Sequence, residues 1–316
     1  MIYTHNGIMH TDELGAIATL RCAGISDQVI RTRDLKKIPN GSFLIDLGME
    51  YDETSNKFDH HQQGGAGLRA NGVPYASFGL VWKHFGLQAV SQTLSLVIPH
   101  ELMQEIDFNI LVSKVVDLVD ASLVQGIDAR DNGIKTHHGL NNASPYTVSD
   151  VISAFNAPWY INQNDNDLLF QEALNKMISI LKNEIVNQSG AVLADQVVYS
   201  MIKDQDDNKI IILDRFVPWG NVIPQKCANA LYVVFKDITG SYRVQAVPVG
   251  IKKESFELRA PLPTAWRGKT RDELAQITRC EDIIFVHNAG FIMGTTSYES
   301  AIYCAELAVS VHEGNK

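Results

Sequence analysis

The sequence has no long hydrophobic run, few cysteines and no basic leader. Its longest apolar stretches, such as Ile210–Leu213 and Ile283–Val286, are as short as a strand, whereas a membrane helix needs roughly 20 residues. The four cysteines are scattered without a Cys-x-x-Cys pair, which favours buried free thiols. No basic segment followed by an apolar one opens the chain, so we expect no signal peptide and a cytoplasmic protein.

Basic residues are also outnumbered. The chain has 27 Lys and Arg against 36 Asp and Glu, a net charge of −9, which repels phosphates on average and disfavours general binding to nucleic acid or anionic membranes. With 45% hydrophobic and 20% charged residues, the composition is otherwise that of a globular protein. At about 150 residues per domain, 316 residues suggest two domains.

Short β-branched runs alternate with helical patterns over residues 1–90. We expect strands at Ile2–Thr4, Gln28–Thr32 and Ser42–Leu47, and helices at Asp12–Ala23 and Tyr75–Phe85. Gly86 is expected to end the second helix. Strands and helices in this order are typical of a parallel sheet flanked by helices, in which ligands bind at the carboxyl ends of the strands.

The remainder is first helical and then mixed. We expect helices at His100–Ile106, Ile110–Asp128, Asp167–Val198 and Tyr298–Ser310, and strands at Lys209–Leu213, Ala230–Lys236, Tyr242–Val247 and Ile283–Val286. The sequence thus predicts the α/β class. An N-terminal α/β/α domain with a parallel sheet and a helical extension would span residues 1–195, and a smaller C-terminal α/β domain with a mixed sheet residues 196–316.

Histidines and acidic residues fall where the first strands end and helices begin. They are His5 after the first strand, His10 and Asp12 at the first helix, Asp46 after the third strand, Asp59-His60-His61 in a loop, and Asp128 and Asp131 at the end of a later helix. Carboxylates crowded at one rim of a sheet need a neutralising cation. Imidazole and carboxylate without thiolate favour Mn²⁺ or Mg²⁺, and Asp46 is placed to bridge two ions about 3.5–4 Å apart.

This succession of motifs resembles the DHH phosphoesterase superfamily, which is named for its Asp-His-His tripeptide. The segments THNGIMHTDE, VIRTRD, FLIDLGMEYD, FDHHQ and DARDNGI are similar to those of one branch, the melanocyte proliferating gene exonuclease family and its bacterial relatives. In the second part, ILDRFVPW, YRVQAVP, FELRAPLPTAWRG and IFVHNAGFIMG continue the similarity, which therefore covers nearly the whole chain.

The resemblance implies a DHH-type catalytic domain with a two-metal centre. The metal ligands it implies are His5, His10, Asp12, Asp46, His60 and Asp128, with Asp46 as the bridge. His61 would face the substrate phosphate, and Asp59 would orient a histidine. Asp120 and Asp131 stay open as alternatives to Asp128.

A basic stretch between Arg243 and Arg271 predicts where the second domain holds phosphates. The candidate substrate-binding residues are Arg259, Arg267, His287 and Gly290. The two arginines belong to the basic stretch, and His287 and Gly290 follow a strand that runs into a glycine-containing turn, where backbone N–H groups can face an anion. Trp219 and Trp266 are either base-stacking surfaces or buried packing residues, and packing is favoured.

We therefore expect a phosphodiesterase with two Mn²⁺ ions, for which Mg²⁺ or Co²⁺ would substitute. The leading hypothesis is an exonuclease that acts on a strand end of single-stranded RNA or DNA, with Asp46 and His61 as catalytic residues and hydroxide attack on phosphorus. One alternative is a hydrolase of short oligonucleotides, pyrophosphate or nucleotide bisphosphates; another is a non-catalytic, metal-binding regulatory protein. No membrane partner is expected, and the oligomeric state is left open, with a homodimer as one option.

Overall fold

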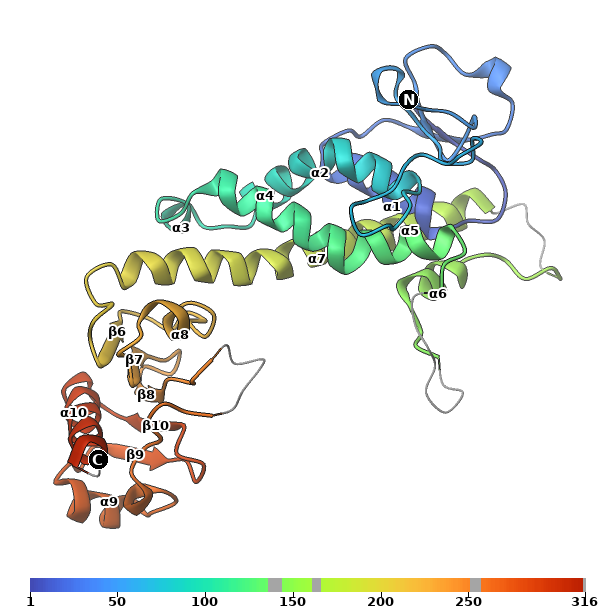
Figure 1. Ribbon diagram of the computed structural model, residues 1–316. Helices are drawn as coiled ribbons and strands as arrows, with labels where there is room; N and C mark the ends of the chain where they lie inside the picture. The colour runs from blue at the N-terminus through green and yellow to red at the C-terminus, as the bar shows by residue number, and fades with distance from the viewer. Residues whose placement is uncertain (136–143, 161–165, 251–256, 315–316) are drawn as a thin grey trace. The chain divides into compact units, whose positions relative to one another are not determined.

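The computed structural model describes residues 1–135, 144–160, 166–250 and 257–314, which form two compact units (Figure 1). The first unit contains Met1–Met103 and Asp107–Gly190, and the second contains Gln104–Ile106 and Ala191–Lys316. The division falls inside helix α7 (Asn166–Met201). This helix continues without a break through the polar residues around position 190. The functional boundary predicted between residues 195 and 196 stays a prediction.

The first unit contains a five-stranded sheet in the order β2-β1-β3-β5-β4. Its strands are β1 (Ile2–Thr4), β2 (Val29–Arg31), β3 (Phe43–Ile45), β4 (Tyr51–Asp52) and β5 (Lys57–Phe58). All pairs are parallel except that of the edge strand β4 with β5. Strands β1, β3 and β5 are neighbours that run in the same direction, so the residues that follow them emerge along one edge.

Helices α1 (Thr11–Cys22) and α2 (Ser77–Ser95) pack side by side in this unit. Gly15 permits the close approach, because its missing side chain leaves room for the ring of Phe78. The prediction that Gly86 ends the second helix is wrong. Gly86 lies against the indole of Trp82, and the helix continues because Ala89 and Val90 bury the next turns.

The other helices of the first unit begin at α3 (His100–Met103) and α4 (Phe108–Val119). A π-helical turn, η3 (Asp120–Val124), follows α4 and leads into α5 (Gln125–Asp131); α6 (Val148–Ser153) and α7 come next. The sequence predicted one regular helix from Ile110 to Asp128. A π turn holds an additional residue, so it changes which of the following side chains share a face. Short 3₁₀ turns lie at η1 (Leu35–Lys37), η2 (Glu53–Ser55) and η5 (Thr264–Trp266).

The second unit is built on a five-stranded sheet in the order β6-β7-β8-β10-β9. The sheet is mixed, as predicted, although its number of strands and their order were not predicted. Its strands are β6 (Ile210–Leu213), β7 (Tyr232–Lys236), β8 (Tyr242–Ala246), β9 (Ile283–Val286) and β10 (Ile292–Thr295), and its helices are α8 (Ile223–Lys226), α9 (Arg271–Thr278) and α10 (Tyr298–Gly314). Only β6 and β7 pair in parallel. Helix α10 packs on the sheet through buried small residues such as Ala301, Ala305 and Ala308. The sequence predicted neither α9 nor β10.

All four cysteines are buried free thiols, which confirms the expectation from their spacing. Within the described ranges, we find no helix that combines the length and the apolar character needed to cross a membrane.

The packing of α1 on α2 gives a first prediction. A Cβ atom on Gly15 would lie 2.5 Å from Cδ1 of Phe78, so Gly15→Ala should lower the free energy of unfolding by about 1–3 kcal/mol through overpacking. The matched control is Gly126→Ala in α5, where nothing lies within 4 Å and alanine should stabilise the helix by up to about 1 kcal/mol. Urea denaturation followed by circular dichroism measures both changes, and equal effects would contradict the packing argument.

Candidate metal centre

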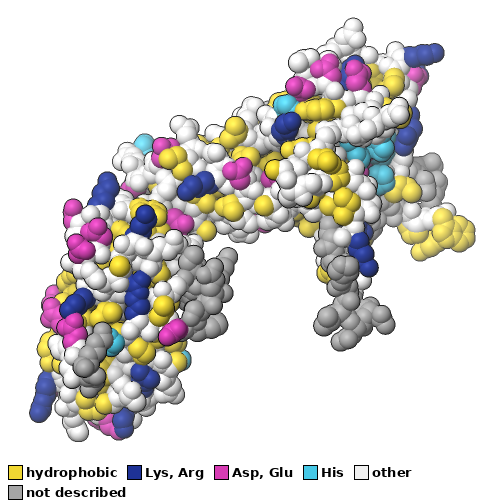
Figure 2. Space-filling view, viewed as in Figure 1, with side chains coloured by type: hydrophobic (Ala, Val, Ile, Leu, Met, Phe, Trp, Pro, Cys, Tyr) yellow, Lys and Arg dark blue, Asp and Glu magenta, His cyan; other side chains and the backbone are white. Residues whose placement is uncertain are grey.

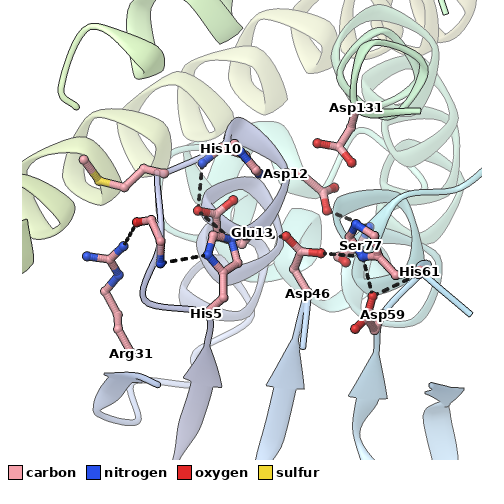
Figure 3. A network of polar contacts seen from close by, with 12 residues as sticks. His5, His10, Asp12, Glu13, Arg31, Asp46, Asp59, His61, Ser77 and Asp131 are labelled. Carbon is pink, nitrogen blue, oxygen red and sulfur yellow. Dashed lines mark hydrogen bonds and ion pairs between the residues drawn. The ribbon is translucent and has the colours of Figure 1, made fainter. Parts of the chain in front are cut away.

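Polar side chains meet at the carboxyl ends of three neighbouring strands (Figure 3). His5 follows β1, Asp46 follows β3, and Asp59 follows β5 directly. Asp46 has a φ of 50°, a left-handed conformation that residues other than glycine rarely adopt. Strain of this kind is retained mainly at functional sites, and here it places the carboxylate of Asp46 in the middle of the rim.

The first group of potential ligands surrounds His5. One atom each from His5, His10, Glu13 and Asp46 lies within 4.8 Å of the others. The Nε2 atom of His5 is 3.3 Å from Oδ2 of Asp46 and 3.5 Å from Oε1 of Glu13. Three of these four residues were predicted from the sequence, and Glu13 was not.

Two further groups share residues with the first and with each other. Asp46 approaches His60 and His61, and His60 in turn approaches Asp12 and Asp131. The Nε2 atom of His60 is 3.0 Å from Oδ2 of Asp131 and 3.9 Å from Oδ1 of Asp46. Asp46 therefore connects the two ends of the cluster, as a bridging ligand would.

Buried atoms without hydrogen bonds show what this cluster fits. Within the part of the chain that the structure describes, four of its buried atoms have no hydrogen-bond partner: Nε2 of His5, Oε2 of Glu13, Oδ1 of Asp46 and Nε2 of His60. These four atoms lie near other polar atoms of the cluster, but the distances and angles are not those of hydrogen bonds. Buried polar atoms are almost always satisfied, so four unsatisfied ones with lone pairs in one place fit a cation site.

Burial also shapes the protonation of the acidic residues. It raises the pKa of Asp12 well above its usual value, and the nearby carboxylates of Asp131, Asp46 and Asp128 raise it further. For Asp46, burial also raises the pKa, but the imidazoles of His5, His61 and His60 outweigh it and lower the pKa overall. Asp46 is thus held as the carboxylate, while the repulsion on Asp12 calls for a positive charge nearby.

The loop that carries His10 is fixed by contacts from Asn156, which follows α6, and from Arg31, the last residue of β2. Asn156 clamps Met9, since Met9 N–H donates to Oδ1 of Asn156 at 2.8 Å and Nδ2 of Asn156 donates to the Met9 carbonyl at 3.0 Å. On the other side, the guanidinium of Arg31 donates to the carbonyl of Gly7 at 2.6 Å (Figure 3). These contacts hold the chain between β1 and α1, and with it His10.

Asp12 and Asp59 organise other parts of the site. The two carboxylate oxygens of Asp12 accept hydrogen bonds from the backbone N–H groups of Phe78 at 2.7 Å and Ser77 at 2.9 Å, at the start of α2. A carboxylate is favoured at a helix N-terminus. Asp59 accepts from the N–H groups of Met49 at 2.6 Å and His61 at 3.0 Å, and lies 2.8 Å from Nδ1 of His61.

His61 is thereby oriented with one nitrogen committed. An ionised carboxylate only accepts hydrogen bonds, so Nδ1 of His61 donates to Asp59 and Nε2 faces away from it. The His61 side chain is 55% exposed. In the space-filling view, histidine side chains gather at one place on the surface of the first unit (Figure 2), and His10 and His61 are the exposed members of the site. The site therefore opens to solvent on the side where these two histidines lie.

Asp128 lies outside the three groups of potential ligands, and its role as a metal ligand stays a prediction. Its Oδ2 atom pairs with the guanidinium of Arg69 at 2.7 Å, and its Oδ1 atom accepts from the N–H of Gly79 at 3.0 Å. Arg69 also holds Asp120, the other alternative, at 2.7 Å. Burial raises the pKa of Asp128 to about 7 although Arg69 opposes this. Asp131, which the sequence left open as an alternative to Asp128, lies beside His60.

Arg69 had not been singled out in the sequence. It lies in the glycine-rich loop after the Asp-His-His motif, is 8% exposed, and stacks on the ring of Tyr75 at 4.2 Å. Gly79 is required for its contact with Asp128, since a Cβ on Gly79 would lie 1.9 Å from Oδ2 of Asp128. Nothing in the spacing of these residues indicates the pair; Glu13, by contrast, stands next to Asp12 in the quoted motif.

The predicted substrate-binding residues of the second unit separate into two places. Nε of Arg267 donates to the carbonyl of Leu262 at 2.8 Å, and the guanidinium packs on Gly290, whose φ of 70° suits glycine. Gly290 N–H donates to the His287 carbonyl at 2.8 Å, so Arg267, His287 and Gly290 lie together. Arg259 does not join them. Its guanidinium donates to carbonyls around the end of α8, those of Pro224, Cys227, Ala228 and Ala230.

Both tryptophans considered as base-stacking surfaces are buried. Trp219 is 4% exposed and Trp266 is 2% exposed, which confirms the packing alternative.

The sequence is similar to those of several known proteins. The family MYG1_exonuc, described as Uncharacterised protein family (UPF0160), matches residues 1–309. The MYG1 protein C27H6.8 of Caenorhabditis elegans is 30% identical over 100% of this chain and 96% of its own length. The MYG1 exonuclease of Homo sapiens is 26% identical over 98% of this chain and 85% of its own length.

Two solved structures were also matched. One is the pGpG-specific phosphodiesterase PggH from Vibrio cholerae, at 12% identity and a TM-score of 0.28 over 100% of this chain and 99% of that one. The other is RecJ from Thermus thermophilus in complex with Mg²⁺, at 15% identity and a TM-score of 0.27 over 98% of this chain and 49% of that one.

The buried ion pair gives a second prediction. Arg69→Ala leaves Asp128 buried and unpaired, which should lower the free energy of unfolding by about 3–5 kcal/mol. Adding Asp128→Asn should restore part of the loss, because it removes the unpaired charge. Arg130→Ala is the control, and it should have far less effect because its pair with Asp150 is exposed. Urea denaturation of the three variants tests this; no recovery in the double variant would contradict it.

Proposed function

The chain belongs to the MYG1_exonuc family, and from this premise we propose that it is a divalent-metal-dependent exonuclease that hydrolyses phosphodiester bonds at an end of single-stranded RNA or DNA. Relatives that match 98% of this chain are named MYG1 exonuclease in Mus musculus and Homo sapiens. The observation that carries the proposal is the cluster of buried, unpartnered ligand atoms on either side of Asp46.

The residues divide naturally between two cations. His5 and His10 would hold one, while Asp12, His60 and Asp131 would hold the other, with Asp46 as the shared ligand. Two divalent ions so bound supply a nucleophile from water at neutral pH and neutralise charge that develops on a phosphate. The mixture of imidazole and carboxylate supports Mn²⁺, with Mg²⁺ or Co²⁺ as substitutes.

His61 is the catalytic side chain of the protein itself in this proposal. Asp59 fixes its Nδ1, so the exposed face of the ring can contact a substrate oxygen through Nε2. A protonated imidazole there would donate to the phosphate and stabilise negative charge on it. Asp59 fixes the orientation of the ring, because its carboxylate accepts from Nδ1.

In this proposal the second unit binds phosphate groups. The group of Arg267, His287 and Gly290 offers a guanidinium next to a turn whose backbone can face an anion. Arg259 is left out of this proposal, because carbonyl groups occupy its guanidinium.

Metal removal tests the activity directly. Protein treated with a chelator and dialysed should not shorten an end-labelled single-stranded oligonucleotide, and added Mn²⁺ should restore the cleavage, because the cluster cannot activate water without cations. Parallel assays on pyrophosphate and dinucleotides separate an exonuclease from a hydrolase of small phosphoesters. Absence of cleavage with Mn²⁺, Mg²⁺ and Co²⁺ alike would rule out the nuclease.

Substitution of the acidic residues tests the assignment of ligands. Asp46→Asn and Asp131→Asn should each lower the rate of cleavage by more than about 100-fold and weaken Mn²⁺ binding, because each removes a charged ligand. Asp128→Asn is the informative control, since Asp128 contacts Arg69 and not the cluster. Isothermal titration with Mn²⁺ measures the outcome, and loss of Mn²⁺ binding in Asp128→Asn with retention in Asp131→Asn would reverse our assignment.

A further inference from the structure

Glu13 is a buried carboxylate that its local hydrogen bond does not explain. It occupies the third position of α1, where its Oε1 atom accepts from the backbone N–H of His10 at 2.8 Å, as in a capping box. Its side chain is 0% exposed, and within the described residues its Oε2 atom has no hydrogen-bond partner. A helix cap needs only one of the two oxygens and gains nothing from burying the other.

A second capping box in the same chain shows what a cap without a further role looks like. Glu273 holds the same position in α9 and accepts from the N–H of Thr270 at 2.9 Å. Its side chain is 45% exposed, and its other oxygen accepts from Lys269 at 3.0 Å. The hydrogen bond from the Thr270 backbone lowers the pKa of Glu273 to about 2, whereas burial raises the pKa of Glu13 well above its usual value.

The surroundings of Glu13 provide the partner that its free oxygen lacks. Its carboxylate lies with His5, His10 and Asp46 in a group whose ligand atoms are within 4.8 Å of one another. Nε2 of His5, 3.5 Å from Oε1 of Glu13, is likewise buried without a hydrogen bond. Two imidazoles and two carboxylates then surround one point at this end of the site.

We propose that Glu13 is a metal ligand together with His5, His10 and Asp46, and that this end of the centre selects Mn²⁺ over Mg²⁺. The inference rests on the proposed function, because it concerns the same metal centre. The other end offers Asp12, Asp131, the shared Asp46 and the imidazole of His60; His61 also approaches Asp46, but its Nδ1 donates to Asp59. Imidazole favours transition-metal ions, whereas carboxylate and water suit Mg²⁺, so the two ends differ in their preference.

Titration of the metal-free, full-length protein with Mn²⁺ tests Glu13 as a ligand without any assay of activity. The wild type should bind two Mn²⁺ ions, and Glu13→Gln should lose one or bind it at least about tenfold more weakly. The glutamine keeps the size of the side chain and an oxygen for the His10 N–H, so the helix cap is retained. Glu273→Gln is the matched control and should bind two ions like the wild type.

Further measurements keep the outcomes distinct. Glu13→Asp keeps the charge but shortens the side chain and moves the carboxylate away from the other ligands, so it should also weaken the binding of one Mn²⁺ ion. This variant replaces Glu13→Gln in the test if Glu13→Gln does not fold. Titration of the wild type with Mg²⁺ should show one site much weaker than the other. Unchanged binding of two Mn²⁺ ions by both Glu13 variants would overturn the role of Glu13, and equal Mg²⁺ sites would overturn the selection. A wild type that binds no Mn²⁺ would instead overturn the proposed function.

Discussion

The burial of several carboxylates beside one another at the end of the sheet is the constraint on which the rest of the site depends. Asp12 and Glu13 are almost completely removed from solvent, and Asp46 shares one group of potential ligands with Glu13 and another with His60. Such groups repel one another in a medium of low polarity, so the arrangement persists only if positive charge or protons offset the repulsion. Histidines do this in part for Asp46, whose pKa they lower against the effect of burial. The remaining unsatisfied atoms are what two cations would complete.

A second layer of contacts keeps these groups in place although they repel one another. Asp12 accepts hydrogen bonds from two backbone N–H groups at the start of α2, which ties α1 to α2. Arg69 ties the loop after the Asp-His-His motif to Asp120, the first residue of the π turn, and to Asp128, which follows that turn in α5. Arg69, whose guanidinium is paired with both Asp120 and Asp128, thus positions the helix that carries Asp131. It does this without a contact with the metal centre itself.

Sequence patterns predicted those features that depend on local periodicity. The limits of β1 and β9 agree with the structure, and α7 differs by only a few residues at its ends. Motif spacing predicted His5, His10, Asp12, Asp46, His60 and His61, and the structure brings these six together. Spacing did not indicate the π turn at Asp120–Val124, which interrupts the single helix predicted from Ile110 to Asp128. Asp128 was preferred because its segment resembles the family's, and that resemblance carries no information on its pairing with Arg69. Arg69 and the carbonyl contacts of Arg259 join residues distant in sequence, so no local pattern could indicate them.

The acidic balance of the chain acquires a different meaning once the site is known. An excess of nine negative charges spread over the surface would oppose any phosphate ligand. However, Asp12, Glu13, Asp46, Asp59 and Asp131 gather at one rim, and two divalent cations would offset most of their negative charge. A phosphate that approaches the loaded centre would then meet little net negative charge there, although the rest of the surface still repels it. This combination disfavours binding along a duplex, whose many phosphates would face that surface, and it favours a strand end, which brings few phosphates to one place.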